Sequence, residues 1–149
     1  MTSIPARCIE RHSNPAFQIK EQLSEVTFEN PELLEIHQIA VDGCVLGEGG
    51  GERCDWLINV LQKSAVRGND RSLLVELKGS DIDKAVRQLV ASQTKLADHI
   101  NRHVTWIVCY SGSPRFNTAI ANLVRNAKKD HRATLSVNDP WNYDTTHTH

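Results

Sequence analysis

The chain has 149 residues, of which 40% are hydrophobic and 23% are charged, and its formal net charge at pH 7 is −1. This length suffices for one domain with a buried core, and the composition is that of an ordinary globular protein. No stretch approaches the roughly 18 consecutive apolar residues of a membrane-spanning helix. The first residues have no apolar signal core, so we expect a cytoplasmic protein.

The small net charge hides two halves of opposite sign. Residues 1–60 contain 4 Lys and Arg against 10 Asp and Glu, whereas residues 61–149 contain 13 against 8. The two balances are −6 and +5. A basic second half can present a phosphate-binding surface, but an ordinary solvated surface explains the same pattern. Charge alone therefore does not indicate a nucleic-acid partner.

Four cysteines are scattered along the chain without a C-x-x-C pair: Cys8, Cys44, Cys54 and Cys109. Zinc sites built from cysteine usually contain such pairs. We therefore expect all four to be reduced, buried thiols of a cytosolic protein.

The first 35 residues are the hardest part of the chain to interpret, and we expect a helical or irregular segment there. Asn14-Pro15 can act as the cap and the first-turn residue of a helix that reaches about Val26. Its apolar positions match one helical face only loosely. We assign residues 1–35 to the same domain as the elements that follow.

Three strands joined by short connections are predicted next. They cover Ile36–Leu46, Arg53–Leu61 and Ser72–Lys78. The glycine-rich run 47–52 between the first two strands lacks the Gly-Lys-Ser/Thr of a phosphate-binding loop, so a hairpin loop is the better interpretation. The short connections predict a three-stranded antiparallel meander.

The second half of the sequence alternates between helices and strands. The clearest element is a helix over Ser80–Ile100, with Ser80 as its cap and apolar residues at helical spacing. A nearly apolar strand over Val104–Tyr110 follows, and then an amphipathic helix over Ser113–Lys129. Thr134–Val137 favours a fifth strand. The polar residues 138–149 are expected to form a poorly ordered tail.

Charged residues stand on the two buried strands of the predicted meander. Asp55 opens the second strand, while Glu76 and Lys78 are two residues apart on the third and therefore share a face. Burying a carboxylate in an apolar sheet costs roughly several kcal/mol unless a cation or hydrogen bonds compensate. One lysine cannot neutralise two carboxylates, so a divalent metal between Asp55 and Glu76 would complete the site. An internal salt bridge between Lys78 and either carboxylate is the alternative.

This pattern resembles the PD-(D/E)XK nuclease superfamily, whose members share the restriction-endonuclease-like fold. The resemblance rests on Asp55, on Glu76-x-Lys78 and on the helix behind them, and it covers residues 36–110. It implies an α/β three-layer sandwich with a mixed central sheet, in which residues 36–137 form the nuclease-like core. In that core the antiparallel meander is followed by a helix, a strand and a second helix. The resemblance also implies hydrolysis of phosphodiester bonds in DNA.

The resemblance further implies a role for each site residue. Asp55, Glu76 and the backbone carbonyl of Leu77 would bind Mg²⁺ or Mn²⁺, ions that prefer oxygen ligands. Lys78 would orient the attacking water or stabilise charge on the phosphate. Gln88, on the following helix, would complete the catalytic residues. A path for DNA phosphates would involve the basic residues Lys84, Arg87, Lys95 and Arg115.

Other aspects of the resemblance stay open. Many family members carry a further acid on a helix before the meander, and here four residues compete for that role: Glu10, Glu21, Glu25 and Glu35. RNA cleavage would use the same residues as DNA cleavage. A non-catalytic module that keeps the fold and binds nucleic acid or protein is the alternative function.

The partner of such a nuclease can also be inferred. A chain of this size encloses little duplex and one site cuts one strand, so we expect a homodimer or a partner protein. No attached recognition domain is evident, and this suggests a component of a defence or mobile-element system.

Overall fold

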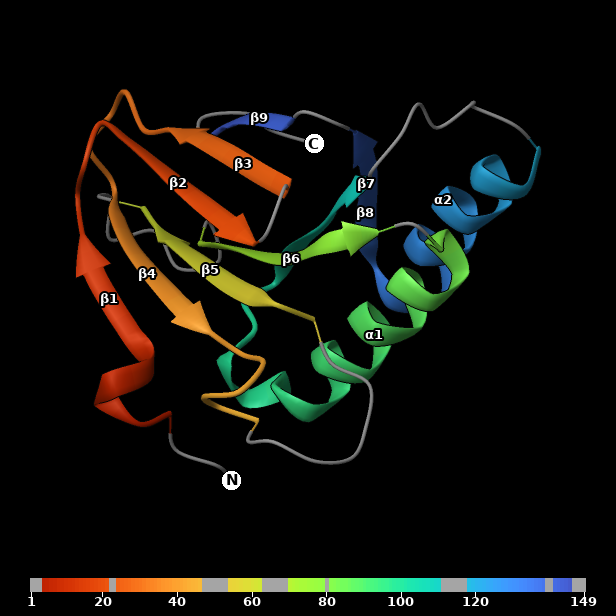
Figure 1. Cartoon of the computed structure of the whole chain (residues 1–149), viewed down its shortest axis with the longest axis horizontal. Helices are drawn as coiled ribbons and strands as arrows, with labels where there is room; N and C mark the ends of the chain where they lie inside the picture. Colours follow the sequence, from red (N-terminus) through yellow and green to blue (C-terminus); the bar gives the residue numbers. More distant parts are fainter. Residues whose placement is uncertain are drawn as a thin grey trace.

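The computed structural model describes residues 4–21, 24–46, 54–62, 70–79, 81–110, 118–138 and 141–145. This part of the chain contains nine strands in two sheets and two α-helices, α1 (Ile82–Lys95) and α2 (Thr118–His131). Figure 1 shows the larger sheet through the middle of the molecule, with both helices on the right and the small sheet at the upper left. None of the described helices combines the length and the apolar character needed to cross a membrane.

The larger sheet has six strands, which confirm the predicted mixed sheet. In order across the sheet they are β1 (Ile9–His12), β4 (Glu35–Ala40), β5 (Trp56–Leu61), β6 (Arg71–Gly79), β7 (His103–Tyr110) and β8 (Ala133–Asn138). The pairs β1–β4, β4–β5 and β5–β6 are antiparallel, so the predicted meander is confirmed as β4, β5 and β6. The pairs β6–β7 and β7–β8 are parallel. Parallel neighbours need a crossover connection, and α1 and α2 supply the two crossovers.

The small sheet corrects the prediction for the N-terminal segment. Its order is β2 (Ala16–Glu21), β3 (Ser24–Glu29) and β9 (Trp141–Asp144), so the predicted helix from Asn14 to Val26 is wrong. The apolar residues of β2 and β3 alternate with polar ones, which is the period of a strand. Their pairing places Phe17 opposite Phe28 and Ile19 opposite Val26, on one buried face. The two phenylalanine rings stack with centroids 4.8 Å apart.

The predicted poorly ordered tail also contains structure. Strand β9 pairs in parallel with β3, and Tyr143 lies opposite Phe28 in the core. Beyond β9, the backbone N–H of Thr145 donates to the carbonyl of Glu29 at 2.9 Å. The Thr145 hydroxyl donates to Oδ1 of the buried Asn30 at 3.0 Å, across a separation of 115 residues. The prediction failed because the partner of this segment lies near the other end of the chain.

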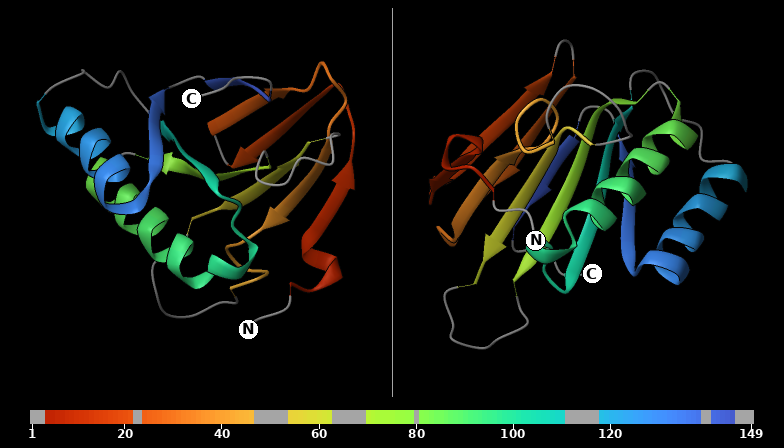
Figure 2. Two further views of the ribbon diagram at one scale, coloured as in Figure 1. Left: turned by 180° about the vertical axis from the view of Figure 1, so that it is seen from behind. Right: turned by 90° about the horizontal axis from the view of Figure 1, so that it is seen from below.

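Two apolar cores occupy the two faces of the larger sheet. One lies between the two sheets and the other lies between the larger sheet and the helices, which share one side of it (Figure 2). Side chains alternate along β6, so Leu73, Val75 and Leu77 belong to the first core and Leu74 to the second. By the same alternation Glu76 points towards the helices. The predicted α/β class is confirmed, but the layer opposite the helices is a sheet rather than a helix.

The limits of several elements differ from the predictions. The first strand of the meander ends at Ala40, and the next residues form a turn with a bridge between Asp42 and Leu46. Gly43 has a φ of 78° in this turn, a conformation that favours glycine. Helix α1 is capped by Asp81, whose carboxylate accepts the N–H of Lys84 at 3.1 Å. The predicted cap Ser80 and the predicted start of the second helix at residue 113 lie outside the described residues, and the fifth strand is confirmed as β8.

The cysteine prediction is wrong for one pair. Cys8 and Cys44 form a disulfide, with Cα atoms 5.7 Å apart. Cys8 directly precedes β1 and Cys44 lies in the turn after β4, and these two strands are neighbours in the sheet. The tertiary pairing of β1 with β4 therefore brings the two thiols together. Cys54 and Cys109 are free and buried, as predicted.

Candidate functional site

The pairing of β5 with β6 brings Asp55 and Glu76 together. The register places Trp56 opposite Val75, and the N–H of Asp55 donates to the carbonyl of Val75 at 3.0 Å. Asp55 directly precedes β5, just beyond the last registered pair, and its Oδ2 accepts the N–H of Leu77, the residue after Glu76, at 2.8 Å. The charges of Asp55 and Glu76 both act on the thiol of Cys54, which is next to Asp55 in the chain. The fold therefore juxtaposes the two carboxylates that the sequence analysis singled out.

Both carboxylates are withdrawn from water. The exposed fraction is 8% for Asp55 and 3% for Glu76. Leu74 belongs to the core beneath the helices, and by the alternation along β6 Glu76 faces the same side. Two ionised carboxylates this close repel each other in a buried site, so a proton, a cation or hydrogen-bond donors must compensate.

One donor comes from the backbone of β6. The N–H of Leu77 donates to Oδ2 of Asp55 at 2.8 Å. The strand is irregular here. Glu76 pairs with Val108 and Gly79 with Tyr110, so a spacing of three residues on β6 matches a spacing of two residues on β7. An extra residue of this kind is a β-bulge, which redirects side chains and occurs often beside active sites. Asp55 therefore also stabilises the backbone at the start of the bulge.

Two further polar residues adjoin the carboxylates, and the sequence analysis did not assign either of them to the site. The N–H of the buried Cys54 donates to Oγ of the buried Ser92 on α1 at 2.6 Å. Burial raises the pKa of the Cys54 thiol to about 12, and the charges of Glu76 and Asp55 contribute in the same direction. The thiol is therefore protonated at neutral pH. The signal that could have revealed Ser92 is its spacing of three residues from Leu89, on the buried face of α1.

Three of the predicted site residues are placed only in part. Lys78 belongs to β6, and the structure describes its backbone but not its side chain. Gln88 is partly buried on α1, next to the buried residues Ala85 and Ser92 on the helical face that packs on the sheet. The side chain of Leu77 belongs to the core between the sheets, so this residue can reach the carboxylates only through its backbone. The roles of Lys78, Gln88 and the Leu77 carbonyl remain predictions.

The N-terminal glutamates lie on strands rather than on the helix that the family pattern has. Glu10 lies on β1, Glu21 on β2, Glu25 on β3 and Glu35 on β4. Glu25 pairs with Lys20 at 3.4 Å, and Glu35 pairs with a histidine two residues away at 2.6 Å. Among the described residues, no three His, Cys, Asp or Glu side chains are grouped so that they could hold a metal ion. A site of two carboxylates completed by backbone and water oxygens is a different arrangement, which suits Mg²⁺.

The predicted phosphate-contacting residues are on the helical side of the molecule. Lys84, Arg87 and Lys95 are exposed on α1, and Arg115 lies outside the described residues. Helix α2 adds the exposed residues Arg125, Lys128 and Lys129. Exposure of this kind permits contact with phosphates but does not require it.

Comparison of the chain with models of protein families, with curated proteins and with solved structures finds no match. What can be stated about this protein therefore comes from its own fold and site. It is an α/β protein with a mixed six-stranded sheet, in which a buried aspartate directly before β5 and a buried glutamate on β6 lie at one pair of neighbouring strands.

Proposed function

We propose that this protein is a metal-dependent nuclease that hydrolyses phosphodiester bonds in DNA and has a restriction-endonuclease-like core. The observation that carries the proposal is the burial of two carboxylates at the β5–β6 pair: Asp55, directly before β5, and Glu76 on β6. The order of β4, β5, β6, α1 and β7 supports it, because this is the order that the resemblance predicts. The bulge that follows Glu76 supports it as well.

The donor set of this pair fits Mg²⁺ or Mn²⁺. Oδ2 of Asp55 is held by the Leu77 N–H, while Oδ1 accepts no hydrogen bond from the described residues and could bind a cation. Glu76 and the carbonyl of Leu77 would provide further oxygen ligands. When bound, such an ion supplies a water of lowered pKa and positive charge beside the phosphate. Lys78 would hold the attacking water, and Gln88 would orient the site from α1.

A non-catalytic binding module is the second candidate function. One observation favours it: the hydrogen bond from Leu77 to Asp55 gives this carboxylate a structural role that needs no metal. The exposed cations of α1 and α2 would then dock the protein on phosphates or on an acidic protein surface. Metal binding separates the two candidates, because a docking module does not require it.

Cleavage of duplex DNA would require more than one copy of the site. One pair of carboxylates acts on one strand, so a homodimer or a partner protein would supply the second cut. RNA cleavage would use the same residues, and only the substrate distinguishes the two activities.

The deciding experiment compares the wild-type chain with Glu76→Gln. Supercoiled plasmid, single-stranded DNA and RNA are incubated with Mg²⁺, with Mn²⁺ or with EDTA. We expect metal-dependent cleavage that falls by at least about 100-fold in the variant, the size of effect seen when one transition-state contact is removed. Glu25→Gln is the matched control, because Glu25 is an ion-paired glutamate on the small sheet.

A thermal unfolding series with Mn²⁺ accompanies the assay. Ligand binding to the native state raises the melting temperature, and we expect a rise in the wild type and in Glu25→Gln but not in Glu76→Gln. Absence of both cleavage and a Mn²⁺-dependent rise would exclude the nuclease and leave the docking module. A Mn²⁺-dependent rise in the melting temperature without cleavage would support the metal site and would indicate that cleavage needs a partner protein.

A further inference from the structure

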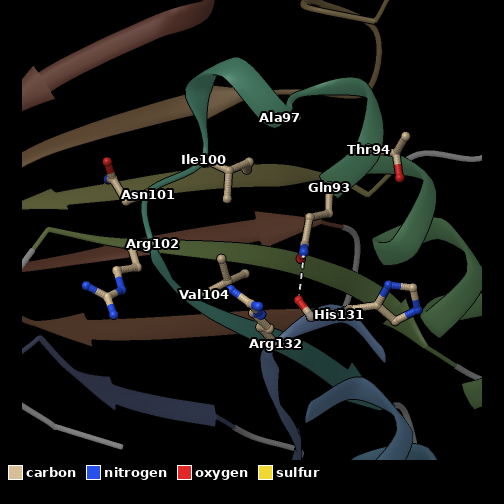
Figure 3. Close-up of a pocket in the computed structure, with 9 residues that line it drawn as sticks. All are labelled: Gln93, Thr94, Ala97, Ile100, Asn101, Arg102, Val104, His131 and Arg132. Atoms are coloured by element: carbon tan, nitrogen blue, oxygen red, sulfur yellow. Dashed lines mark hydrogen bonds between the residues drawn. The ribbon is translucent and has the colours of Figure 1, made fainter. Parts of the chain in front are cut away.

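A pocket lies at the end of the larger sheet remote from Asp55 and Glu76. It has a volume of about 330 Å³ and lies between the end of α1, the start of β7 and the end of α2 (Figure 3). Strand β7 begins at His103 beside the pocket, whereas Glu76 of β6 is paired with Val108, five residues further along β7. That separation is roughly 16 Å along the strand. The pocket is therefore distinct from the carboxylate pair.

The floor of the pocket is apolar and one wall is held in place by hydrogen bonds. The apolar lining residues are Ala97, Ile100 and Val104. The side-chain oxygen of Gln93 accepts from Nε1 of Trp106 at 2.8 Å. Nε2 of Gln93 donates to the carbonyl of His131 at 2.9 Å, and Figure 3 shows this second bond. This second bond satisfies one of the carbonyls at the C-terminus of α2. The helix dipole leaves a partial negative charge there, so an anion in the pocket depends on the positive charge of the arginines.

The charged residues that line the pocket are cations. Arg102 and Arg132 both line it, and no acidic residue does so among the described residues. Neither arginine forms an ion pair with a described carboxylate. Figure 3 shows Arg132 next to Val104 and Arg102 at the rim on the other side of the strand. Two guanidinium groups that no described carboxylate pairs, next to apolar lining residues, suit an anion that is attached to an apolar body.

Arg132 has an unusual backbone conformation. It directly follows α2, and its N–H donates to the carbonyl of Lys128 at 3.2 Å, which closes the helix. Its φ is 54°, in the left-handed region where glycine is preferred and a side chain is strained. A substitution at this position therefore has to suit a left-handed backbone conformation.

We propose that this pocket binds a phosphorylated ligand the size of one nucleotide. The guanidinium of Arg132 would bind the phosphate, Arg102 would add positive charge at the rim, and a planar apolar body would lie over Ile100 and Val104. Guanidinium groups bind phosphate through paired hydrogen bonds, and the volume is at the lower end of the range of roughly 300–1,000 Å³ for small-molecule pockets. The ligand is a free nucleotide or the terminal nucleotide of a strand. The inference does not rest on the nuclease proposal, because neither the metal nor the carboxylate pair is involved.

Titration calorimetry in EDTA tests this proposal with paired probes. The probes are adenosine monophosphate beside adenosine, and a short single-stranded oligonucleotide with and without a 5′-phosphate. We expect the phosphorylated member of at least one pair to bind about tenfold more tightly, as a charge-assisted hydrogen bond implies. Binding of the monophosphate would identify a free nucleotide, and binding of the 5′-phosphorylated oligonucleotide alone would identify a strand end.

Substitutions of the two arginines test whether the ligand binds in this pocket. Arg132→Asn removes the guanidinium and keeps a residue that tolerates the left-handed region, and Arg102→Gln removes the other cation. Each should weaken binding by about tenfold. Arg11→Gln is the control, because Arg11 is exposed on β1 at the far edge of the sheet.

Arg132→Gly gives an independent readout. It should raise the melting temperature by about 2–4 °C, because the backbone strain is relieved. It should also weaken ligand binding as much as Arg132→Asn does. Equal binding of phosphorylated and unphosphorylated probes, or unchanged affinity in the Arg132 and Arg102 variants, would overturn the proposal. Loss of nuclease activity in Glu76→Gln leaves these measurements unaffected, so the two proposals fail separately.

Discussion

Cys54 shows how strongly the surroundings of Asp55 and Glu76 are shielded from water. Its thiol is fully buried between the sheet and α1, and it donates to the carbonyl of Trp56 at 3.5 Å. Burial and the two neighbouring carboxylates together raise its pKa from 9.0 to about 12. A site that holds a thiol in its neutral form would also strengthen any interaction between the carboxylates and a cation, because water does not screen it.

The thiol pKa leads to a prediction about stability at high pH. The folded chain keeps the Cys54 proton until about pH 12, whereas the unfolded chain loses it near pH 9.0. The free energy of unfolding should therefore be unaffected by this group below pH 9 and should fall between these two values. The slope is about 1.4 kcal/mol per pH unit.

Urea unfolding of the wild type and Cys54→Ala between pH 7 and pH 10.5 measures this contribution. The difference between the variants at pH 7 reports the loss of packing, and its change with pH reports the titration. We expect the wild type to lose stability more steeply above pH 9 than the variant. Parallel curves would show that the thiol has an ordinary pKa.

At the scale of elements, the small sheet is the layer that the sequence analysis did not foresee. It covers the face of the larger sheet opposite the helices, and it is completed by β9 from the C-terminal part of the chain. The ring of Tyr143 lies 6.0 Å from that of Phe28 between centroids. The hydrogen bonds of Thr145 to Glu29 and Asn30 then attach the end of β9 to β3. The segment taken for a tail is therefore part of the core.

Truncation tests the contribution of β9. A chain that ends at Asn138 loses the burial of Tyr143, exposes the edge of β3 and removes the two hydrogen bonds from Thr145 to Glu29 and Asn30. Oδ1 of Asn30 keeps the hydrogen bond from the N–H of Leu34 at 3.1 Å. Burial of one aromatic side chain contributes about 1.5–3 kcal/mol, and each hydrogen bond contributes about 0.5–1.5 kcal/mol. We expect a loss of at least about 3 kcal/mol in the free energy of unfolding, measured by urea denaturation. A chain that ends at Thr145 is the control, and equal stability of the two truncations would refute this role.

At the scale of the whole molecule, the disulfide joins two segments that are distant in the sequence. It links Cys8, in a 3-10 helix (Ala6–Cys8) before β1, to Cys44 after β4, across 36 residues. Closing a loop of this length in the unfolded chain corresponds to about 3–4 kcal/mol of stability in the chain-entropy description. The cross-link holds together one edge of the larger sheet.

Reduction measures that contribution. We expect dithiothreitol to lower the free energy of unfolding of the wild type by about 3–4 kcal/mol. A variant with Cys8→Ser and Cys44→Ser should have the lower stability from the outset and should not respond to the reductant. Thiol titration of the unfolded, unreduced wild type should count two free cysteines, Cys54 and Cys109. Four free cysteines would show that the disulfide does not form.

The parts of the fold that could be predicted from sequence are those whose pattern is local. Apolar residues recur at helical spacing along α1, and continuous apolar runs form β5, β6 and β7. The candidate site could be predicted in part for the same reason, because Asp55 and Glu76 are carboxylates on apolar strands. The helix predicted from Asn14 is wrong because Asn14-Pro15 has the residues of a helix cap, whereas the period of two extends over only six residues in each of β2 and β3.

The sequence by itself determined the meander, the helix after it, the two later strands of the larger sheet and the two carboxylates. Only the tertiary structure decided that β9 joins β3, that Cys8 pairs with Cys44, that Ser92 meets Cys54 and that Arg102 and Arg132 line one pocket. The physical reason is that a local pattern encodes which face of an element avoids water. Which distant surface covers that face depends on how all the elements bury their apolar area together.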